Sequence, residues 1–193
     1  RPISMKGPLL SMELYGDPSL RTSRDLDLMV AREDLTRAGA IMRDMGYALE
    51  EHITTATPRR RKFYQRIENE KHEVYNRGEI CLELHWKGGY QTEESFDALW
   101  QRREERQLMG RPIAVLGADD RYPALFTHAA EHGFMRLRWL LDLYELRRKP
   151  GFDWEHLYSL MAEQGIGEIG LLALLVMHRL GLPGLEDTAW EGF

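Results

Sequence analysis

The segment Arg24–Val30 constrains the fold of this chain more than any other, because it alternates acidic and apolar side chains. Successive side chains of a β-strand point to opposite faces, so Asp25 and Asp27 would share one face while Leu26 and Leu28 take the other. The apolar face can enter a core. The two carboxylates would then lie close together on the open face, where a cation, strong hydrogen-bond donors or water must offset their repulsion. The cation option predicts a divalent-metal site and phosphoryl chemistry.

The composition indicates a folded protein with one substantial domain or two small ones. The chain has 193 residues, and 43% of them are hydrophobic, which suffices for a packed core. The net charge of -5 argues against a protein that coats nucleic acid, while a local basic patch stays open. The single cysteine, Cys81, excludes an internal disulfide and fits a reducing compartment, so we expect a cytoplasmic protein.

Two features concern membranes and the chain's beginning. No apolar run reaches the roughly 18 residues that would span a bilayer, so we expect no membrane partner. The first residue is Arg1 rather than Met, and we therefore expect the chain to be part of a longer protein.

Hydrophobic periodicity predicts a mixed sheet domain over residues 1–115 and a helical domain over residues 116–193, with the character changing to helix from about residue 92. The predicted strands are Ile3–Met5, Arg24–Val30, Tyr47–His52, Phe63–Ile67, Glu73–Tyr75 and Ile80–Trp86. The predicted helices are Leu9–Leu14, Glu33–Met45, Arg121–His132, Met135–Arg148, Trp154–Glu163 and Ile169–Leu180.

The strand Ile80–Trp86 provides a third acid. Leu82, Leu84 and Trp86 would face one way, and Cys81, Glu83 and His85 the other. If this strand neighbours the first, Glu83 joins Asp25 and Asp27. Mg²⁺ binds through a few carboxylates and substrate phosphates, and two such ions can activate an attacking oxygen and neutralise a leaving pyrophosphate. For Asp25 and Asp27 alone, an exposed strand with alternating polar residues is the simpler interpretation.

The tripeptide Lys6-Gly7-Pro8 comes directly before a predicted helix. Glycine lets a ligand approach the backbone closely, and a helix N-terminus offers free N–H groups and positive potential to a phosphate. Lys6 and Ser11 would add direct phosphate contacts. The alternative is an ordinary strand-to-helix turn.

These three features follow a known order: a glycine at a strand end, two aspartates on the next strand, and one acid on a later strand. The chain therefore resembles the nucleotidyltransferase fold of the DNA polymerase beta superfamily, in particular the uncharacterised bacterial nucleotidyltransferase family proteins. The resemblance covers roughly Ile3 to Pro183. It extends to Leu14–Pro18 followed by Arg21, and to Gly46-Tyr47, Leu84–Trp86 and Leu137–Leu143.

The resemblance implies an α+β fold in which a mixed sheet with flanking helices forms the catalytic domain and a helical domain follows. It implies transfer of a nucleoside monophosphate from a nucleoside triphosphate to an acceptor, which is a small molecule, a protein or an RNA, with release of pyrophosphate. It implies two Mg²⁺ ions, with Mn²⁺ as an alternative, held by Asp25, Asp27 and Glu83. The nucleotide would contact Lys6, Gly7, Ser11, Arg21 and Arg24.

Two departures from the superfamily pattern stand out. Gly7-Pro8 replaces the usual Gly-Ser or Gly-Gly pair, which removes one backbone donor from the phosphate loop. Glu83 replaces the commoner aspartate, and its longer side chain changes the reach of the ligand. The first departure motivates a second hypothesis, a non-catalytic nucleotide-binding or interaction module on the same fold.

Basic residues form a further group of candidates. Arg21 and Arg24 flank the acids and could pair with them or with a triphosphate. The run Arg59–Lys62, with Arg66, is either a solvated loop or a contact for a polyphosphate tail or an anionic acceptor such as RNA.

Histidines offer the last candidates. His128-Ala129-Ala130-Glu131-His132 matches the H-x-x-E-H zinc pattern, so a zinc hydrolase is a remote alternative that needs a third ligand. Otherwise His132, Arg138 and Asp142 either line a cleft between the domains or make simple polar contacts on a helix surface. His85 either acts as a base or orients a metal-bound water, or it is a structural histidine.

Overall fold

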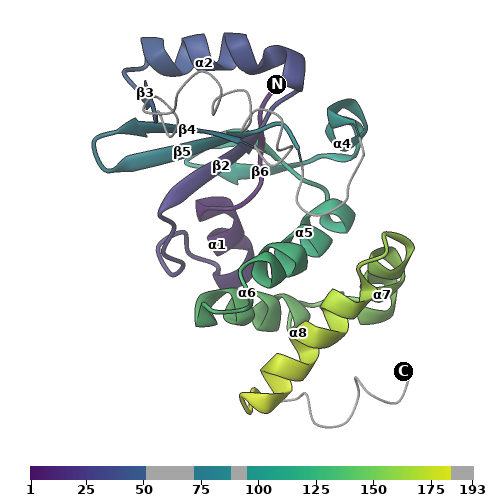
Figure 1. Ribbon diagram of the computed structural model, residues 1–193. Helices are drawn as coiled ribbons and strands as arrows, with labels where there is room; N and C mark the ends of the chain where they lie inside the picture. Colours follow the sequence, from purple (N-terminus) through teal and green to yellow (C-terminus); the bar gives the residue numbers. More distant parts are fainter. Residues whose placement is uncertain (51–71, 88–94, 184–193) are drawn as a thin grey trace, which may run out of the picture. The chain divides into compact units, whose positions relative to one another are not determined.

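The computed structural model describes residues 1–50, 72–87 and 95–183, and their contacts divide them into two compact units. The sheet unit comprises the described residues of 1–10, 22–88 and 94–116. The helical unit comprises residues 11–21 together with 117–183. Among the described residues, the helical unit therefore contains one early segment in addition to the C-terminal helices. These segments can be followed by their colours in Figure 1.

Seven strands form one mixed sheet in the order β3-β4-β5-β2-β1-β7-β6. The β2–β5 and β1–β7 pairs are parallel and the other pairs are antiparallel. The strands are β1 Ile3–Ser4, β2 Asp25–Met29, β3 Ala48–Leu49, β4 His72–Arg77, β5 Ile80–His85, β6 Glu104–Leu108 and β7 Arg111–Val115. This sheet, with its flanking helices and the helices that follow, confirms the predicted α+β class.

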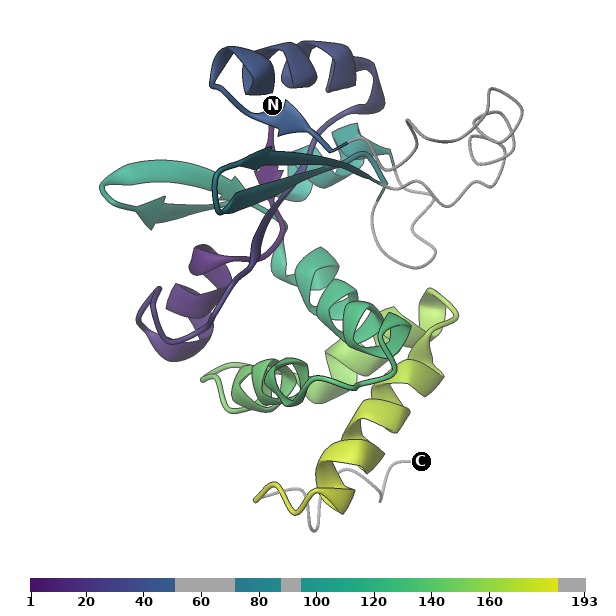
Figure 2. The same cartoon turned by 60° about the vertical axis from the view of Figure 1, so that its left-hand side comes forward.

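The apolar face of the sheet is covered by a helix. The short 3-10 helix η1 (Arg32–Asp34) leads into α2 (Leu35–Asp44), which lies along this face in Figures 1 and 2. The buried cluster joins residues of α2, β2, β4 and β5: Leu26, Leu28, Val30, Leu35, Ala38, Met42, Tyr47, Tyr75, Leu82 and Leu84. Because the leucines of β2 and β5 point into this cluster, the alternating acidic residues point to the opposite face.

A second cluster packs α4 (Phe96–Arg102) against the sheet. Its buried members are Ile3, Met5, Met29, Leu99 and Leu116, with Phe96 and Trp100 packed against them. Met29 follows Asp27 by two residues on the same strand, so the two side chains share a face. Apolar packing therefore covers the acidic face of the sheet at Met29, two residues after Asp27 on the same strand.

The hairpin of β6 and β7 corrects the sequence-based prediction. A change to helix from about residue 92 agrees with α4, but it is wrong for residues 104–115, which form two strands of the sheet. Leu108 pairs with Arg111, so Met109 and Gly110 make a two-residue turn, and their φ angles of 51° and 74° are the positive values that a type I′ turn needs. Met-Gly is not the Asn-Gly or Asp-Gly pair that signals such a turn, which is why the hairpin was missed.

The helical unit agrees with the predicted helices. Its C-terminal helices are α5 Ala118–Glu131, α6 Leu137–Arg147, α7 Trp154–Glu163 and α8 Gly167–Arg179. The helix α1, Pro8–Tyr15, begins in the sheet unit and ends in the helical unit. Arg121 on α5 donates from Nη2 to Glu13 Oε1 on α1 over 2.9 Å, so the early segment is held by the C-terminal helices.

Some predictions lie outside the described residues: the strand Phe63–Ile67, the basic run Arg59–Lys62 with Arg66, and the end of the strand Tyr47–His52. Among the described residues, no helix has both the length and the apolar character that crossing a membrane would require.

Candidate active site

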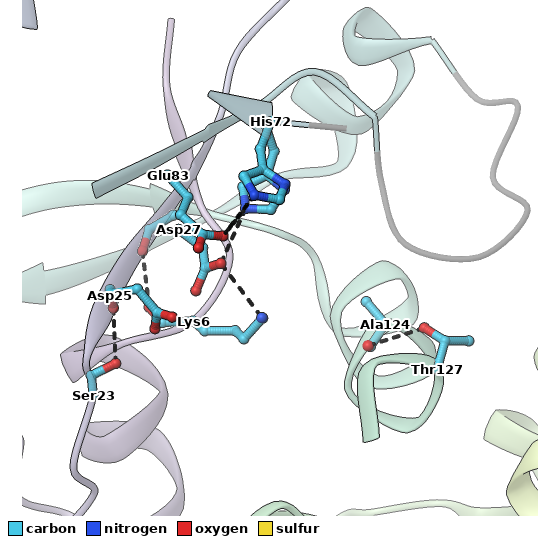
Figure 3. A network of polar contacts seen from close by, with 10 residues as sticks. Lys6, Ser23, Asp25, Asp27, His72, Glu83, Ala124 and Thr127 are labelled. Atoms are coloured by element: carbon cyan, nitrogen blue, oxygen red, sulfur yellow. Dashed lines mark hydrogen bonds and ion pairs between the residues drawn. The ribbon is translucent and has the colours of Figure 1, made fainter. Parts of the chain in front are cut away.

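The three acids predicted from the sequence lie on one face of the sheet. In the parallel β2–β5 pair, Asp27 is the register partner of Glu83, and Asp25 is the partner of Cys81. Register partners on neighbouring strands point to the same face, and residues two apart on a strand do so as well. Asp25, Asp27 and Glu83 therefore share the face opposite α2, and Figure 3 shows this group from close by.

Two of these carboxylates converge on a single atom. His85 Nε2 lies 3.1 Å from Asp27 Oδ1 and 3.2 Å from Glu83 Oε2. Lys6 Nζ lies 3.5 Å from the same Asp27 oxygen, and the Asp27 side chain is only 3% exposed. The buried Asp27 carboxylate thus has an ammonium group and an imidazole beside it, which offset the cost of removing its charge from water.

The ionisation of the cluster follows from these contacts. The hydrogen bond from His85 is the main cause that lowers the pKa of Glu83 below its ordinary value. Burial opposes the charged form of His85, but its hydrogen bonds to Asp27 and Glu83 outweigh that effect and raise its pKa. Burial also raises the pKa of the Cys81 thiol, and the nearby charges of Glu83 and Asp25 add to the shift. A thiol in this environment is a poor nucleophile.

His72 is a site residue that the sequence analysis missed. Its Nε2 lies 3.8 Å from Glu83 Oε2, and its ring centroid lies 4.9 Å from that of His85. Figure 3 labels His72 and Glu83 in the same group of side chains. Burial lowers its pKa. The antiparallel register that places His72 opposite His85 could have been counted back from the turn after Arg77, which the sequence does signal. The predicted strand Glu73–Tyr75 began one residue too late to include it.

The predicted phosphate loop lies next to the acids. Gly7 has a φ of +87°, and a Cβ at this position would lie 3.4 Å from Leu26 Cδ2. The positive φ is the reason that glycine is needed here. Pro8 then begins α1, where its missing N–H costs nothing. Lys6 reaches Asp27, and Arg24 is exposed beside Asp25.

This arrangement of acids and loop can be compared with known protein families. The family model described as uncharacterised nucleotidyltransferase matches residues 1–181 of the chain. The chain belongs to this nucleotidyltransferase family. The family resemblance predicted from the sequence is thereby confirmed, and with it the expectation of a transferase. No curated protein matches the chain in sequence.

Two solved structures share the fold of this nucleotidyltransferase. The solution structure of the antibiotic-resistance factor ANT(2'')-Ia has a TM-score of 0.52 at 15% identity, covering 93% of this chain and 83% of that one. The crystal structure of ANT(2'')-Ia in complex with adenylyl-2''-tobramycin has a TM-score of 0.51 at 14% identity, covering 93% and 88%. At these identities the likeness shows the fold alone.

Two of the residues predicted to contact phosphate have polar partners within the helical unit. In this nucleotidyltransferase the Ser11 side chain is fully buried, its Oγ donates to the Asp17 carbonyl over 2.6 Å, and it accepts from the Arg21 N–H over 3.0 Å. Arg21 Nε donates to Asp142 Oδ2 over 2.8 Å, and both side chains are buried. These contacts join residues within the helical unit, and a phosphate contact by Ser11 or Arg21 stays a prediction.

The predicted cleft residues of the nucleotidyltransferase also have structural partners. Asp142 is buried and accepts from Tyr15 Oη over 2.9 Å in addition to Arg21. Arg138 lies near enough for its charge to favour the ionised form of Asp142. His132 stacks on Trp139 with ring centroids 4.7 Å apart, which assigns it a packing role within the helical unit.

The zinc-hydrolase alternative finds no support in the nucleotidyltransferase. His128 also packs against Trp139, with ring centroids 5.0 Å apart. Within residues 1–50, 72–87 and 95–183, the group with metal-ligand spacing is a different one, formed by His72, Glu83 and His85. The H-x-x-E-H pattern therefore gains no third ligand from the described residues.

Proposed function

We propose that this protein transfers a nucleoside monophosphate from a nucleoside triphosphate to an acceptor hydroxyl and releases pyrophosphate. Membership of the nucleotidyltransferase family supports the class of reaction. The observation that carries the proposal is the convergence of Asp27 and Glu83 oxygens on one point, within 3.2 Å of His85 Nε2. Asp25 shares that face of the sheet.

The residues fit divalent ions. Carboxylate oxygens are the protein ligands that Mg²⁺ prefers, and Asp25, Asp27 and Glu83 offer them from two adjacent strands that fix their spacing. We propose that these three residues hold two Mg²⁺ ions, with Mn²⁺ as the alternative. When bound, the ions supply charge neutralisation for the phosphates and lower the pKa of a bound hydroxyl.

The chain's own groups would bind and orient the nucleotide. Lys6 Nζ, 3.5 Å from Asp27, is placed to contact phosphate oxygens that come to lie beside that carboxylate. Gly7 lacks a side chain where the phosphates would approach the backbone, and α1 begins directly afterwards. His85 Nε2 contacts both Asp27 and Glu83 and so holds the two carboxylates in one orientation.

We infer that the acceptor is a small molecule with a hydroxyl group rather than a protein or an RNA. The solved structure of ANT(2'')-Ia holds adenylyl-2''-tobramycin, in which an adenylyl group is joined to a small molecule, and that protein shares the fold over 93% of this chain. The net charge of -5 also disfavours a polyanionic acceptor. The single cysteine supports a cytoplasmic location.

A turnover experiment tests the proposal. We would incubate the purified chain with each α-labelled triphosphate, Mg²⁺ or Mn²⁺ and pools of hydroxyl-bearing small molecules, and measure pyrophosphate and labelled product. Asp25→Asn and Asp27→Asn should each lower turnover by at least roughly 100-fold while the fold persists, because each removes a negative ligand for the ions. Asp97→Asn is the matched control, since Asp97 is an exposed carboxylate paired with Arg1. Wild-type turnover in both site variants would disprove the assignment.

The non-catalytic module is the second candidate. Pro8 removes one backbone donor from the loop, and Lys6 and His85 both contact Asp27. On this hypothesis the triphosphate binds but is not consumed. Bound, intact triphosphate across the whole acceptor screen would favour the module over the transferase.

A further inference from the structure

Three side chains beside the acid pair form a ligand set of another kind. His72, Glu83 and His85 each offer one ligand atom, a ring nitrogen or a carboxylate oxygen, and these three atoms all lie within 4.8 Å of one another. The distance from Glu83 Oε2 is 3.8 Å to His72 Nε2 and 3.2 Å to His85 Nε2. Figure 3 shows the imidazole of His72 above Glu83, on the same side as Asp27. Two ring nitrogens and one carboxylate oxygen thus point at a shared volume.

The backbone holds these ligands in place. Glu83 and His85 are two residues apart on β5, and His72 is the register partner of His85 on β4. The two strands are joined by a tight turn in which Arg77 pairs with Ile80. Because β5 also pairs with β2, it is hydrogen-bonded on both sides. Ligands on paired strands keep their spacing without a loop having to order, so little entropy opposes metal binding.

The donor set selects the metal. Ligand atoms about 2.0–2.2 Å from a tetrahedral ion lie roughly 3.3–3.5 Å from each other, close to the two distances at Glu83. Imidazole nitrogens suit Zn²⁺ and other transition ions, whereas Mg²⁺ and Ca²⁺ take oxygen ligands. Two histidines and one glutamate form a set known from catalytic zinc sites. The group of Asp25, Asp27 and Glu83 offers only oxygen ligands and therefore favours Mg²⁺ or Ca²⁺.

We propose that His72, Glu83 and His85 form a binding site for a transition-metal ion of the Zn²⁺ class, which shares Glu83 with the proposed Mg²⁺ site and differs from it in its two histidine ligands. Asp27 Oδ1, 3.1 Å from His85 Nε2, is placed to become a fourth ligand. An effect of this ion on turnover rests on the proposed function, whereas its binding does not.

The test is a titration of the metal-free chain with Co²⁺, whose visible ligand-field absorption reports nitrogen ligation. We expect one Co²⁺ per chain, displaced by Zn²⁺ and not by excess Mg²⁺. His72→Ala should weaken binding at least tenfold, and His72→Gln should do the same while preserving side-chain size. His156→Ala is the matched control, because His156 is an exposed histidine that contacts a carboxylate, Asp119, over 3.0 Å in the helical unit. Wild-type Co²⁺ affinity in both His72 variants, or no absorption in the wild type, would overturn the proposal.

A second variant separates this proposal from the transferase. Asp25→Asn should retain Co²⁺ binding, because Asp25 is not in the histidine set, although we expect it to lose turnover. A wild-type chain that binds Co²⁺ through His72 and consumes no triphosphate would leave the metal site standing and remove the transferase. Consumption of triphosphate without Co²⁺ binding would support the transferase and rule out the transition-metal site.

Discussion

At the scale of single residues, the helical unit contains a buried ion pair formed by Arg21 and Asp142. Their side chains are 4% and 3% exposed, and Arg21 Nε donates to Asp142 Oδ2 over 2.8 Å. Tyr15 Oη donates to the other Asp142 oxygen. A buried pair of this kind gains little over an apolar pair, but it is costly to break from one side.

Replacing one partner of this pair should therefore cost more than replacing both. Asp142→Ala leaves the Arg21 guanidinium buried beside a void, and we expect a loss of about 3 to 5 kcal/mol in the free energy of unfolding. Arg21→Met combined with Asp142→Leu should recover most of that loss. Urea denaturation measures both, with Asp119→Ala at an exposed position as the control. If the double variant is as unstable as Asp142→Ala, the burial argument fails.

At the scale of elements, the packing of α2 on the sheet depends on a missing side chain. Gly39 is buried in the interior of α2, and a Cβ built there would lie 2.5 Å from Tyr75 Oη on β4. Tyr75 is buried and donates to Glu73 Oε2 over 2.8 Å. The glycine thus makes room for a hydroxyl group that would otherwise clash with the helix.

A double-mutant cycle tests this fit. Gly39→Ala alone should destabilise the protein by about 1 to 3 kcal/mol, because overpacking outweighs the better helix propensity of alanine. In a Tyr75→Phe background the nearest remaining atoms lie at least 3.5 Å away, so the same change should stabilise by about 1 kcal/mol. Thermal unfolding of the four proteins gives the sign of both effects. A Gly39→Ala effect of the same sign in both backgrounds would contradict the explanation.

The helices and strands also show which parts of the candidate site could be predicted from the sequence. The alternation of polar and apolar residues predicted that Asp25 and Asp27 share one face of a strand. It also predicted that Glu83 and His85 share the polar face of another strand. Both predictions could be made from the sequence because the two-residue period of a strand is a local property. His72 was missed because it reaches the group through the register of β4 and β5. The buried surroundings of Ser11 and Arg21 could not be predicted because they depend on tertiary structure, and Asp142 is 121 residues from Arg21 in the sequence.

At the scale of the whole molecule, the chain passes between the two units more often than a simple tandem arrangement would require. Residues 11–21 belong to the helical unit although residues 1–10 and 22–50 belong to the sheet unit. The division into a catalytic domain over 1–115 and a helical domain over 116–193 stays a prediction. Contacts such as Arg121 to Glu13 tie the early segment to α5.

Residues 117–193 should therefore fold poorly on their own. Without residues 11–21, Asp142 loses Arg21 and Tyr15, and the buried Arg121 loses Glu13. We expect the isolated fragment to unfold at lower urea than the full chain, or to lack a cooperative transition, because it buries charges without their partners. Circular dichroism during urea titration is the measurement. A fragment as stable as the helical unit in the full chain would show that residues 11–21 are dispensable.

The central place of β5 in the sheet has a practical consequence for protein engineering. This strand borders β2 on one side and β4 on the other, so its two hydrogen-bonded edges can be altered independently. Sliding β4 by a single position would turn His72 toward α2 and leave the three carboxylates untouched. If His72, Glu83 and His85 bind a transition-metal ion as proposed, the choice between such an ion and Mg²⁺ would therefore depend on the length of the loop between β4 and β5.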